Sequence, residues 1–365
     1  MKKILAYLLS LSVLFSAGGC KKKINKDVKN DDGRDQLLNK IIYEEETFNS
    51  ELSKEEEKDN KVEVVISAVG DCTLGRDDRG SYAYSLPYYL EINNYDYSYF
   101  FKGVYDILSN DDLTIANLEG TLTDSTDRAE KQFTFKGDSS YTNILSLGSV
   151  EVVNLANNHT MDFGKEGYED TKVALDEAYI GYFGNGIFEI AEIKGIKVGL
   201  AGIKGFSLDS AKAEIDKAKS YFDLNDVQLI IYNFHWGVER EYKQNSVQEE
   251  IARYAVDNGG ANLVIGHHPH VLQGIEKYNG VYIVYSLGNF VFGGNKNPSD
   301  KDTMIIQMSF TFNNLVLEET KLNIIPATLS SSTSRNDYQP TIPDEEKQAK
   351  ILKRVLDNST NFRQD

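Results

Sequence analysis

From residue 61 onward, the chain alternates short apolar runs typical of strands with stretches of helical spacing. Helical spacing is clearest at 165–179 and 246–258, where apolar residues recur every three or four positions. The strand-like runs are 62–69, 113–116, 150–156, 197–202, 227–234, 262–265 and 281–285. Because strands that alternate with helices fold into layered domains, this pattern predicts an α/β domain.

The outer limits of this domain follow from the later part of the chain. In residues 303–317, apolar and polar side chains alternate, which predicts strands late in the chain. Residues 345–356 predict a last helix. A tyrosine-rich stretch, 82–99, predicts a loop and the start of a helix that runs to Leu108. We expect the domain to cover residues 61–330, and residues 331–365 to form a loop and a helix that pack on the domain or trail from it.

Three of the five histidines lie in the segment Gly266-His267-His268-Pro269-His270, directly after an apolar run. Side chains alternate along an extended chain, so we expect His268 and His270 to point the same way and His267 the other way. Two imidazoles that face one way at a strand end predict a pair of metal ligands. A cluster of surface loop histidines is the alternative.

Other polar residues also follow the ends of predicted strands: Asp71, Glu119, Asn158, His159, His235 and Asn289. In open α/β sheets, ligands bind at the carboxyl ends of the strands, so residues far apart in sequence can meet there. Mixed oxygen and nitrogen donors favour manganese, iron or zinc, and a carboxylate can bridge two ions about 3.5–4 Å apart. We expect one or two divalent ions.

Each of these residues also has a purely structural interpretation when taken singly. Asp71 could cap a turn after Gly70, and Asn158 could cap the next segment. His235, which adjoins the single tryptophan Trp236, could be a satisfied core histidine. The metal-site interpretation depends on the coincidence that all five histidines fall at predicted strand ends.

The N-terminus has the pattern of an export signal. Lys2 and Lys3 precede an apolar run, residues 4–15, that is too short to span a bilayer. Small residues then lead into Cys20, so residues 1–20 resemble a bacterial lipoprotein signal in which the cysteine is lipidated. Ala17 stands where that signal usually has leucine, so a plain signal peptide or an uncleaved anchor stays open.

Residues 21–60 alternate basic and acidic clusters with few apolar residues, which is typical of a solvated tether. A flexible coil of this length reaches roughly 35 Å. Together with the signal, this predicts a membrane-anchored protein on the outer face of the cytoplasmic membrane. The formal net charge of −17 argues against a nucleic-acid partner. An anionic substrate remains open, because a bound cation can reverse the local field.

Six ordered motifs within residues 62–295 carry a resemblance to a known family. They are Gly70-Asp71-Cys72-Thr73-Leu74-Gly75-Arg76, Ala116-Asn117-Leu118-Glu119-Gly120, Leu155-Ala156-Asn157-Asn158-His159, His235-Trp236-Gly237-Val238-Glu239, Gly266-His267-His268-Pro269-His270 and Tyr285-Ser286-Leu287-Gly288-Asn289-Phe290. The chain resembles the CapA family of poly-γ-glutamate capsule biosynthesis, whose domain is similar to calcineurin-like metallophosphoesterases.

This resemblance implies an α-β-β-α sandwich of two mixed sheets flanked by helices, with a metal site at one edge. It implies that His159 acts as the general acid that protonates the leaving group, and that a metal-bound water is the nucleophile. The metal ligands that it implies are Asp71, Glu119, Asn158, His235, His268 and His270.

Some positions depart from the phosphoesterase pattern or have other interpretations. Thr73 stands where those enzymes place a histidine, and Glu119 stands where they use an aspartate. Arg76 could hold an anionic substrate group as a bidentate donor, or pair with one of the aspartates at 77 and 78. Asn157 and Asn289 are further candidates for substrate binding. His267 is expected behind the ligands or at the surface.

Three functions are open at this point. The first is a metal-dependent hydrolase or transferase that acts on an anionic capsule or cell-envelope polymer. The second is a non-catalytic accessory subunit that works with polymer synthase subunits in synthesis or export. The third is a lipid-anchored protein that binds a solute, and the concentration of histidines counts against it.

Overall fold

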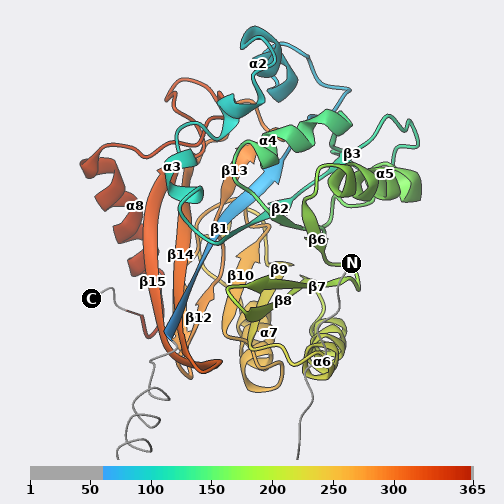
Figure 1. Ribbon diagram of the computed structural model, residues 1–365. Coiled ribbons are helices and arrows are strands. Elements are labelled where there is room, and N and C mark those ends of the chain that lie inside the picture. Colours follow the sequence, from blue (N-terminus) through green and yellow to red (C-terminus); the bar gives the residue numbers. More distant parts are fainter. Residues whose placement is uncertain (1–60, 363–365) are drawn as a thin grey trace, which may run out of the picture. The chain divides into compact units, whose positions relative to one another are not determined.

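The computed structural model describes residues 61–362, which form two large sheets and the helices around them (Figure 1). The first sheet has seven strands. In order across the sheet they are β15 (Val316–Thr328), β14 (Asp302–Asn313), β1 (Lys61–Thr73), β2 (Leu113–Leu118), β5 (Val152–Asn154) and β6 (Gly181–Phe183), with β13 (Asn289–Phe292) also paired to β1.

The second sheet has six strands. Their order is β11 (Ile275–Tyr278), β12 (Val281–Val284), β10 (Leu263–His267), β9 (Leu229–Trp236), β8 (Ile196–Gly205) and β7 (Phe188–Ile193). Both sheets are mixed. In the first, the antiparallel pairs lie on the β15 side and the parallel pairs extend to the β6 edge. In the second, antiparallel pairs lie at both edges and parallel pairs in the centre. A small pair, β3 (Thr121–Leu122) and β4 (Lys136–Gly137), stands apart from them.

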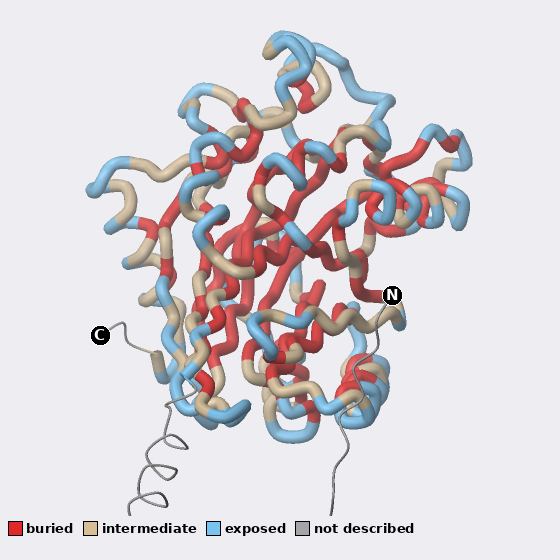
Figure 2. The backbone as a smooth tube through the Cα atoms, viewed as in Figure 1, coloured by how far each residue is buried: buried red, intermediate tan, exposed pale blue. Residues whose placement is uncertain are grey.

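The two sheets pack face to face over a shared apolar core. Ile66 and Ile115 of the first sheet lie in the same buried cluster as Ile231 and Leu263 of the second. Strands in this position are covered on both faces, so β1 is buried at every residue from 66 to 73. Burial of each large apolar side chain contributes about 1.5–3 kcal/mol. Figure 2 shows this concentration of buried residues along the central strands.

Helices cover the outer face of each sheet. The helices are α2 (Leu86–Ile92), α3 (Tyr105–Leu108), α4 (Thr142–Ser146), α5 (Gly164–Glu177), α6 (Leu208–Leu224), α7 (Ser246–Asp257) and α8 (Glu345–Asp357), with 3₁₀ turns η1 (Tyr97–Phe100) and η2 (Ser139–Tyr141). Helices α2, α4 and α5 share a buried cluster with the first sheet, and α6 and α7 share one with the second. The predicted α-β-β-α sandwich is confirmed.

Local sequence explains features of helices α7 and α6. Asn245 and Gln248 form a capping box, in which each side chain accepts a hydrogen bond from the other residue's backbone N–H. Helix α7 begins directly after Asn245. In α6, the buried residues Ala211, Ile215, Ala218 and Phe222 recur every three or four positions. This stripe faces the second sheet.

The expected continuous helix up to Leu108 is wrong. Three short helical pieces, α2, η1 and α3, replace it. Asn94 and Tyr95 have left-handed backbone, with φ of 56° and 58°, and this conformation ends α2. The prediction also missed the short strands β6, β7, β11 and β13, of which β13 matters most for the site.

The chain beyond residue 330 packs on the first sheet. Asp344 caps α8 by accepting a hydrogen bond from the backbone N–H of Lys347. Ile351 and Val355 are buried in the core between the sheets. Arg354 forms ion pairs with Asp300 and Asp302. Helix α8 therefore closes the open side of the sandwich near β15.

The predicted signal (1–20), the lipidation site Cys20 and the tether (21–60) lie outside the described residues. Within residues 61–362, no helix has both the length and the apolar character needed to cross a bilayer. The second cysteine, Cys72, is buried in β1 as a free thiol.

Candidate metal centre

Strand β1 carries Asp71 into the interior of the molecule, where its side chain is fully buried. Its backbone N–H donates to the carbonyl of Gly288, 3.0 Å away, and Asp71 stands opposite Asn289 of β13. Gly70 makes this approach possible, because a Cβ atom there would lie 2.1 Å from the Gly288 oxygen. The β1–β13 contact thus places Asp71 beside Asn289.

Glu119 directly follows β2, and its backbone N–H donates to the carbonyl of Cys72 in β1. Its Oε2 accepts a hydrogen bond from Thr73 (3.4 Å), the residue that stands where phosphoesterases have a histidine. Its Oε1 is buried without a hydrogen-bond donor, 3.6 Å from Nε2 of His235 and 3.9 Å from Nε2 of His270. Glu119 therefore points an unsatisfied oxygen at two imidazoles.

The adjacent strands β9 and β10 bring in the other histidines. His235 and His267 are partners in the parallel register of these strands. The prediction that residues 267–270 alternate as an extended strand is wrong: β10 ends at His267, and His268 and His270 have left-handed backbone with φ of 96° and 57°. The rings of His268 and His270 nevertheless lie on one side, with centroids 5.8 Å apart.

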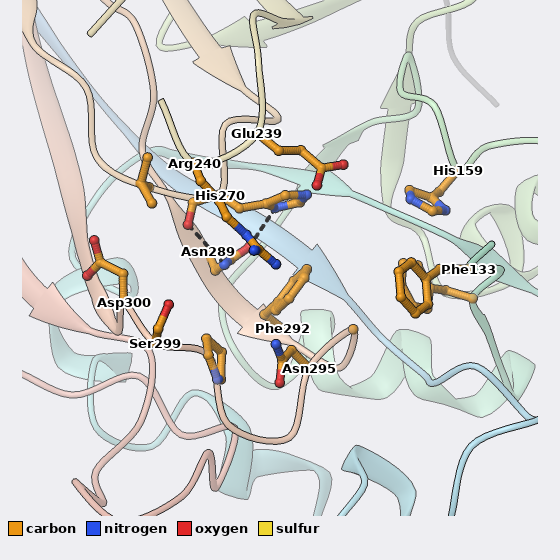
Figure 3. Close-up of a pocket in the computed structure, with 14 residues that line it drawn as sticks. Phe133, His159, Glu239, Arg240, His270, Asn289, Phe292, Asn295, Ser299 and Asp300 are labelled. Atoms are coloured by element: carbon orange, nitrogen blue, oxygen red, sulfur yellow. Dashed lines mark hydrogen bonds between the residues drawn. The ribbon is translucent and has the colours of Figure 1, made fainter. Parts of the chain in front are cut away.

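His270 is fixed by two neighbours at one ring nitrogen. Its Nδ1 lies 2.9 Å from Oδ1 of Asn289 and 3.2 Å from Oδ2 of Asp71. The Asn289 amide also donates to the His270 carbonyl, so the two residues bond twice (Figure 3). With the Nδ1 proton directed at these oxygens, Nε2 is the nitrogen free to bind a metal.

His267 is buried, not exposed, and lies behind the candidate ligands. Its Nδ1 is 3.5 Å from Oδ1 of Asp71, and its Nε2 is 3.3 Å from Oδ1 of Asn233. Asn117, which the sequence did not single out, donates to Oδ1 of Asp71 from 2.8 Å. These side chains hold the Asp71 carboxylate in place.

Five of the predicted ligands gather into two overlapping groups. In each group the donor atoms lie within 4.8 Å of one another. One group is Asp71, Glu119 and His270, and the other is Glu119, His235 and His268. The sixth predicted ligand, Asn158, places Oδ1 2.8 Å from Nε2 of His235. Glu119 belongs to both groups, as a bridging carboxylate would.

A third group adds Glu239 to His268 and His270. Sequence reasoning missed Glu239, which is exposed in the loop after β9. Its place four residues after His235, in a motif already recognised, was the available signal.

The electrostatics of the centre follow from burial and crowding. Burial raises the pKa of Glu119 to about 7, although His270 opposes the shift. Burial alone would lower the pKa of His270, but Glu119 and Asp71 outweigh it and raise this pKa to about 10. Burial lowers the pKa of His268 to about 4 and that of His235 well below its usual range. His235 and His268 are thus neutral, the form in which imidazole binds metal.

The donor set fits a divalent cation. Glu119 Oε1 and His268 Nδ1 are buried without hydrogen-bond partners, which is costly unless another group satisfies them. Two buried carboxylates beside several imidazoles supply mixed oxygen and nitrogen ligation. These residues form a candidate divalent-metal site.

His159 lies beside this site in the turn before α5, where Nδ1 is 2.7 Å from Oδ2 of Asp162. Asp162 is fully buried and also accepts from Lys131 Nζ (2.6 Å) and from the backbone N–H of Phe135 (2.7 Å). The ring of Phe135 packs against the imidazole, with centroids 4.6 Å apart. Asp162 and Lys131 were not predicted, and together with Phe135 they fix the orientation of His159.

Residues 65–294 match the family described as bacterial capsule synthesis protein PGA_cap, which covers more than half of the chain. This chain belongs to the PGA_cap family.

Two similar proteins agree with this assignment. The chain is 29% identical over 307 residues to the capsule biosynthesis protein CapA of Bacillus anthracis, covering 75% of this chain and 71% of CapA. It is also 29% identical over 289 residues to the PGA biosynthesis protein CapA of Bacillus subtilis strain 168, covering 72% of each. The expected resemblance to CapA proteins is confirmed.

Among solved structures, a distant neighbour is the calcineurin-like phosphoesterase YfkN from Bacillus subtilis. Its TM-score is 0.44 at 14% sequence identity, and the match covers 81% of this chain and 98% of that chain.

A pocket of this PGA_cap protein opens beside the centre (Figure 3). Its volume, about 160 Å³, far exceeds the roughly 10–15 Å³ that a cavity needs in order to hold one water. Its lining includes His159, Glu239, Arg240, His270 and Asn289. The predicted general acid, a candidate ligand and a cation therefore face the same space.

The two other predicted substrate-binding residues lie elsewhere. Asn157 is buried and does not line the pocket: its amide donates to the carbonyl of Leu118, and its Oδ1 accepts from the backbone N–H of His159. Arg76 pairs with neither nearby aspartate. It donates to the carbonyl oxygens of Asp77 (3.0 Å) and Gly80 (2.9 Å) at the wall of an adjacent hollow.

Proposed function

We propose that this PGA_cap protein is a metal-dependent hydrolase or transferase that acts on an anionic polymer of the poly-γ-glutamate type. The observation that carries the proposal is the pair of candidate ligand groups that share Glu119, next to His159 and its partner Asp162. The names of the CapA relatives supply the polymer class, and acidic envelope polymers of related chemistry belong to the same proposal.

The residues that would hold one or two divalent ions are Asp71, Glu119, Asn158, His235, His268 and His270, joined by Glu239. Manganese, iron and zinc suit this mixture of oxygen and nitrogen donors. When bound, such ions supply Lewis-acid chemistry that stabilises negative charge developing on a carbonyl or phosphoryl oxygen.

His159 is the residue suited to give a proton to the leaving group. Asp162 holds its Nδ1, which leaves Nε2 as the ring nitrogen available to the pocket. Lys131 also contacts Asp162, which fixes the carboxylate that keeps the ring in one orientation.

Arg240 is suited to hold a carboxylate of the substrate beside the metal centre. It lines the pocket and is exposed, and no carboxylate oxygen within residues 61–362 lies in ion-pair range of its guanidinium. An arginine in this position can bind an anionic group through two parallel hydrogen bonds.

We further propose that lipidated Cys20 anchors the chain at the outer face of the cytoplasmic membrane, where the tether extends the domain toward the polymer. Polymer synthase subunits are the expected protein partners. The basis of this part is the sequence of residues 1–60 alone.

The test begins with metal analysis of the full-length chain after chelation and reloading with manganese, iron or zinc. Turnover is then measured on γ-glutamyl oligomers and on a panel of phosphoesters. We expect His235→Ala to lose metal, and His159→Ala to keep its metal while losing turnover. No retained metal after reloading would refute the proposal. If His159→Ala were silent in capsule assembly while metal was retained, the role of an accessory subunit would replace catalysis.

A further inference from the structure

A second hollow adjoins the metal pocket and has a different lining. It is bordered by Arg76, Arg79 and Lys296. Phe133 and Gly294 line both this hollow and the metal pocket. A chain-like molecule that leaves the metal pocket over these two residues therefore reaches a surface rich in cations.

Arg76 and Lys296 are held in this hollow by backbone carbonyls and not by carboxylates. Arg76 donates to the carbonyls of Asp77 and Gly80, and Lys296 Nζ donates to those of Ser81 and Ala83. Carbonyl oxygens fix the position of a cation without neutralising its charge, so both side chains remain available to an anionic ligand.

The nearest aspartates are occupied by other cations. Asp77 pairs with Arg79 and Arg128, and Asp78 pairs with Arg128. Among the described residues, no carboxylate oxygen lies within the 4.0 Å of an ion pair from Arg76, Lys296 or Arg335.

Arg335 and two tyrosines complete this surface. The Arg335 guanidinium lies 3.8 Å from the ring centroid of Tyr84, and that of Arg76 lies 5.7 Å from the ring of Tyr82. Asn336, next to Arg335, donates to the Lys296 carbonyl from 3.1 Å, which ties the two loops together. Burial lowers the pKa of Lys296, and Arg76 and Arg335 add to this, as expected for cations that crowd one another.

We propose that Arg76, Lys296 and Arg335, together with Tyr82 and Tyr84, form a second subsite for carboxylates of an acidic polymer. A neighbouring unit of the same polymer would lie in the metal pocket, so this inference rests on the proposed function. Arginine forks match carboxylates in geometry, and the half-exposed tyrosine rings can cover the methylene stems of the polymer. The subsite makes long chains bind better than single units.

The test compares binding of a fluorescent γ-linked glutamate dimer and decamer to the full-length chain, by polarisation at low and high salt. The test variant combines Arg76→Gln, Lys296→Gln and Arg335→Gln. The matched control combines Lys217→Gln, Lys350→Gln and Lys353→Gln, which removes the same charge from α6 and α8. We expect the test variant to lose at least about tenfold in decamer affinity at low salt, and the control to change little.

The dimer separates this subsite from the metal pocket. Its affinity should change less than about twofold in the test variant, because it fits within the pocket. Arg335→Gln alone leaves the loop contacts of Arg76 and Lys296 intact, so a loss of affinity in this variant cannot be attributed to misfolding of those loops. It should show part of the decamer loss.

Three outcomes would count against the inference in different ways. Equal decamer affinity in the test variant and the control overturns the subsite and leaves the proposed function standing. Tighter binding of a glycerol-phosphate polymer than of the decamer overturns the carboxylate class. Failure of the unmodified chain to bind either the γ-glutamyl oligomers or the glycerol-phosphate polymer refutes the proposed function itself.

Discussion

The imidazole of His159 and the carboxylate of Asp162 lie 2.7 Å apart, three residues from each other on one turn. The carboxylate accepts two further hydrogen bonds, from Lys131 and from the backbone of Phe135, so its position does not depend on the histidine. Asp162 thus presents a fixed acceptor that selects one ring orientation of His159.

Replacing Asp162 with asparagine should therefore lower turnover by about 10²-fold or more, because the imidazole loses its orienting carboxylate. Metal content should stay unchanged, as measured by elemental analysis of the purified chain. Glu169→Gln, on the exposed side of α5, is the control. An Asp162→Asn protein with normal turnover would show that the contact is structural only.

Replacing Glu119 with glutamine should remove the stabilisation that metal gives to the fold. At a metal concentration 100 times the dissociation constant, the unmodified chain should gain about 2.7 kcal/mol in free energy of unfolding. Thermal unfolding with chelator and with added manganese measures this difference. Glu214→Gln, a half-buried change on α6, should retain the gain. Equal gains in both variants would exclude Glu119 as a ligand.

Replacing Asp111 with asparagine should stabilise the protein at neutral pH. Burial raises the pKa of this carboxyl from 3.8 to about 6, so the folded state binds the proton more tightly than the unfolded state does. The stability that the folded state gains from binding this proton is fully present below about pH 4 and is lost as pH rises through 6. At pH 7 the ionised group costs about 1–2 kcal/mol after allowance for solvent screening.

Denaturant unfolding at pH 4 and pH 7 tests this prediction. Asp111→Asn should be more stable than the unmodified chain at pH 7 and equal to it at pH 4, because the carboxyl is largely protonated there in the folded state. The amide oxygen can still accept the hydrogen bond that Thr114 gives to Asp111. Asp106→Asn, at an exposed position nearby, should show no such gain. A gain of equal size at both pH values would contradict the assignment.

Replacing Gly70 with alanine should damage stability and metal binding together. The added Cβ would lie 2.1 Å from the Gly288 carbonyl and force β1 away from β13. Overpacking of this kind costs about 1–3 kcal/mol, and it would move Asp71 away from Asn289 and His270. Unfolding and metal titration measure the two losses. Gly80→Ala, in an exposed turn, should lose neither.

Much of the fold could be predicted because its central strands are covered on both faces. Runs such as 62–69 and 227–234 are mostly apolar, with two polar residues in each, and they correspond to β1 and β9. Strand β13 was missed because it has only four residues and begins at Asn289, a polar residue at the site. The pairing of two sheets came from the family resemblance, since periodicity does not encode which strands share a sheet.

The candidate ligands were predictable because a strand end is visible in the sequence. Their supporting contacts were not. Asn117 and Asp71 are separated by 46 residues, and His268 and Asp71 by 197, so only the folded chain brings them together. The left-handed backbone of His268 and His270 is equally hidden, because residue type alone does not fix that conformation at a given position.

Strand β1 stands between β2, which follows it closely, and β14, near the other end of the described chain: Lys61 pairs with Asn313. A nascent polypeptide that emerges N-terminus first must therefore wait for its last third before β1 is flanked on both sides. Contacts this remote in sequence slow folding. Chains that end before β14 would carry all five histidines yet leave β1, which holds Asp71, flanked on one side only, so a complete candidate metal centre requires almost the whole described chain.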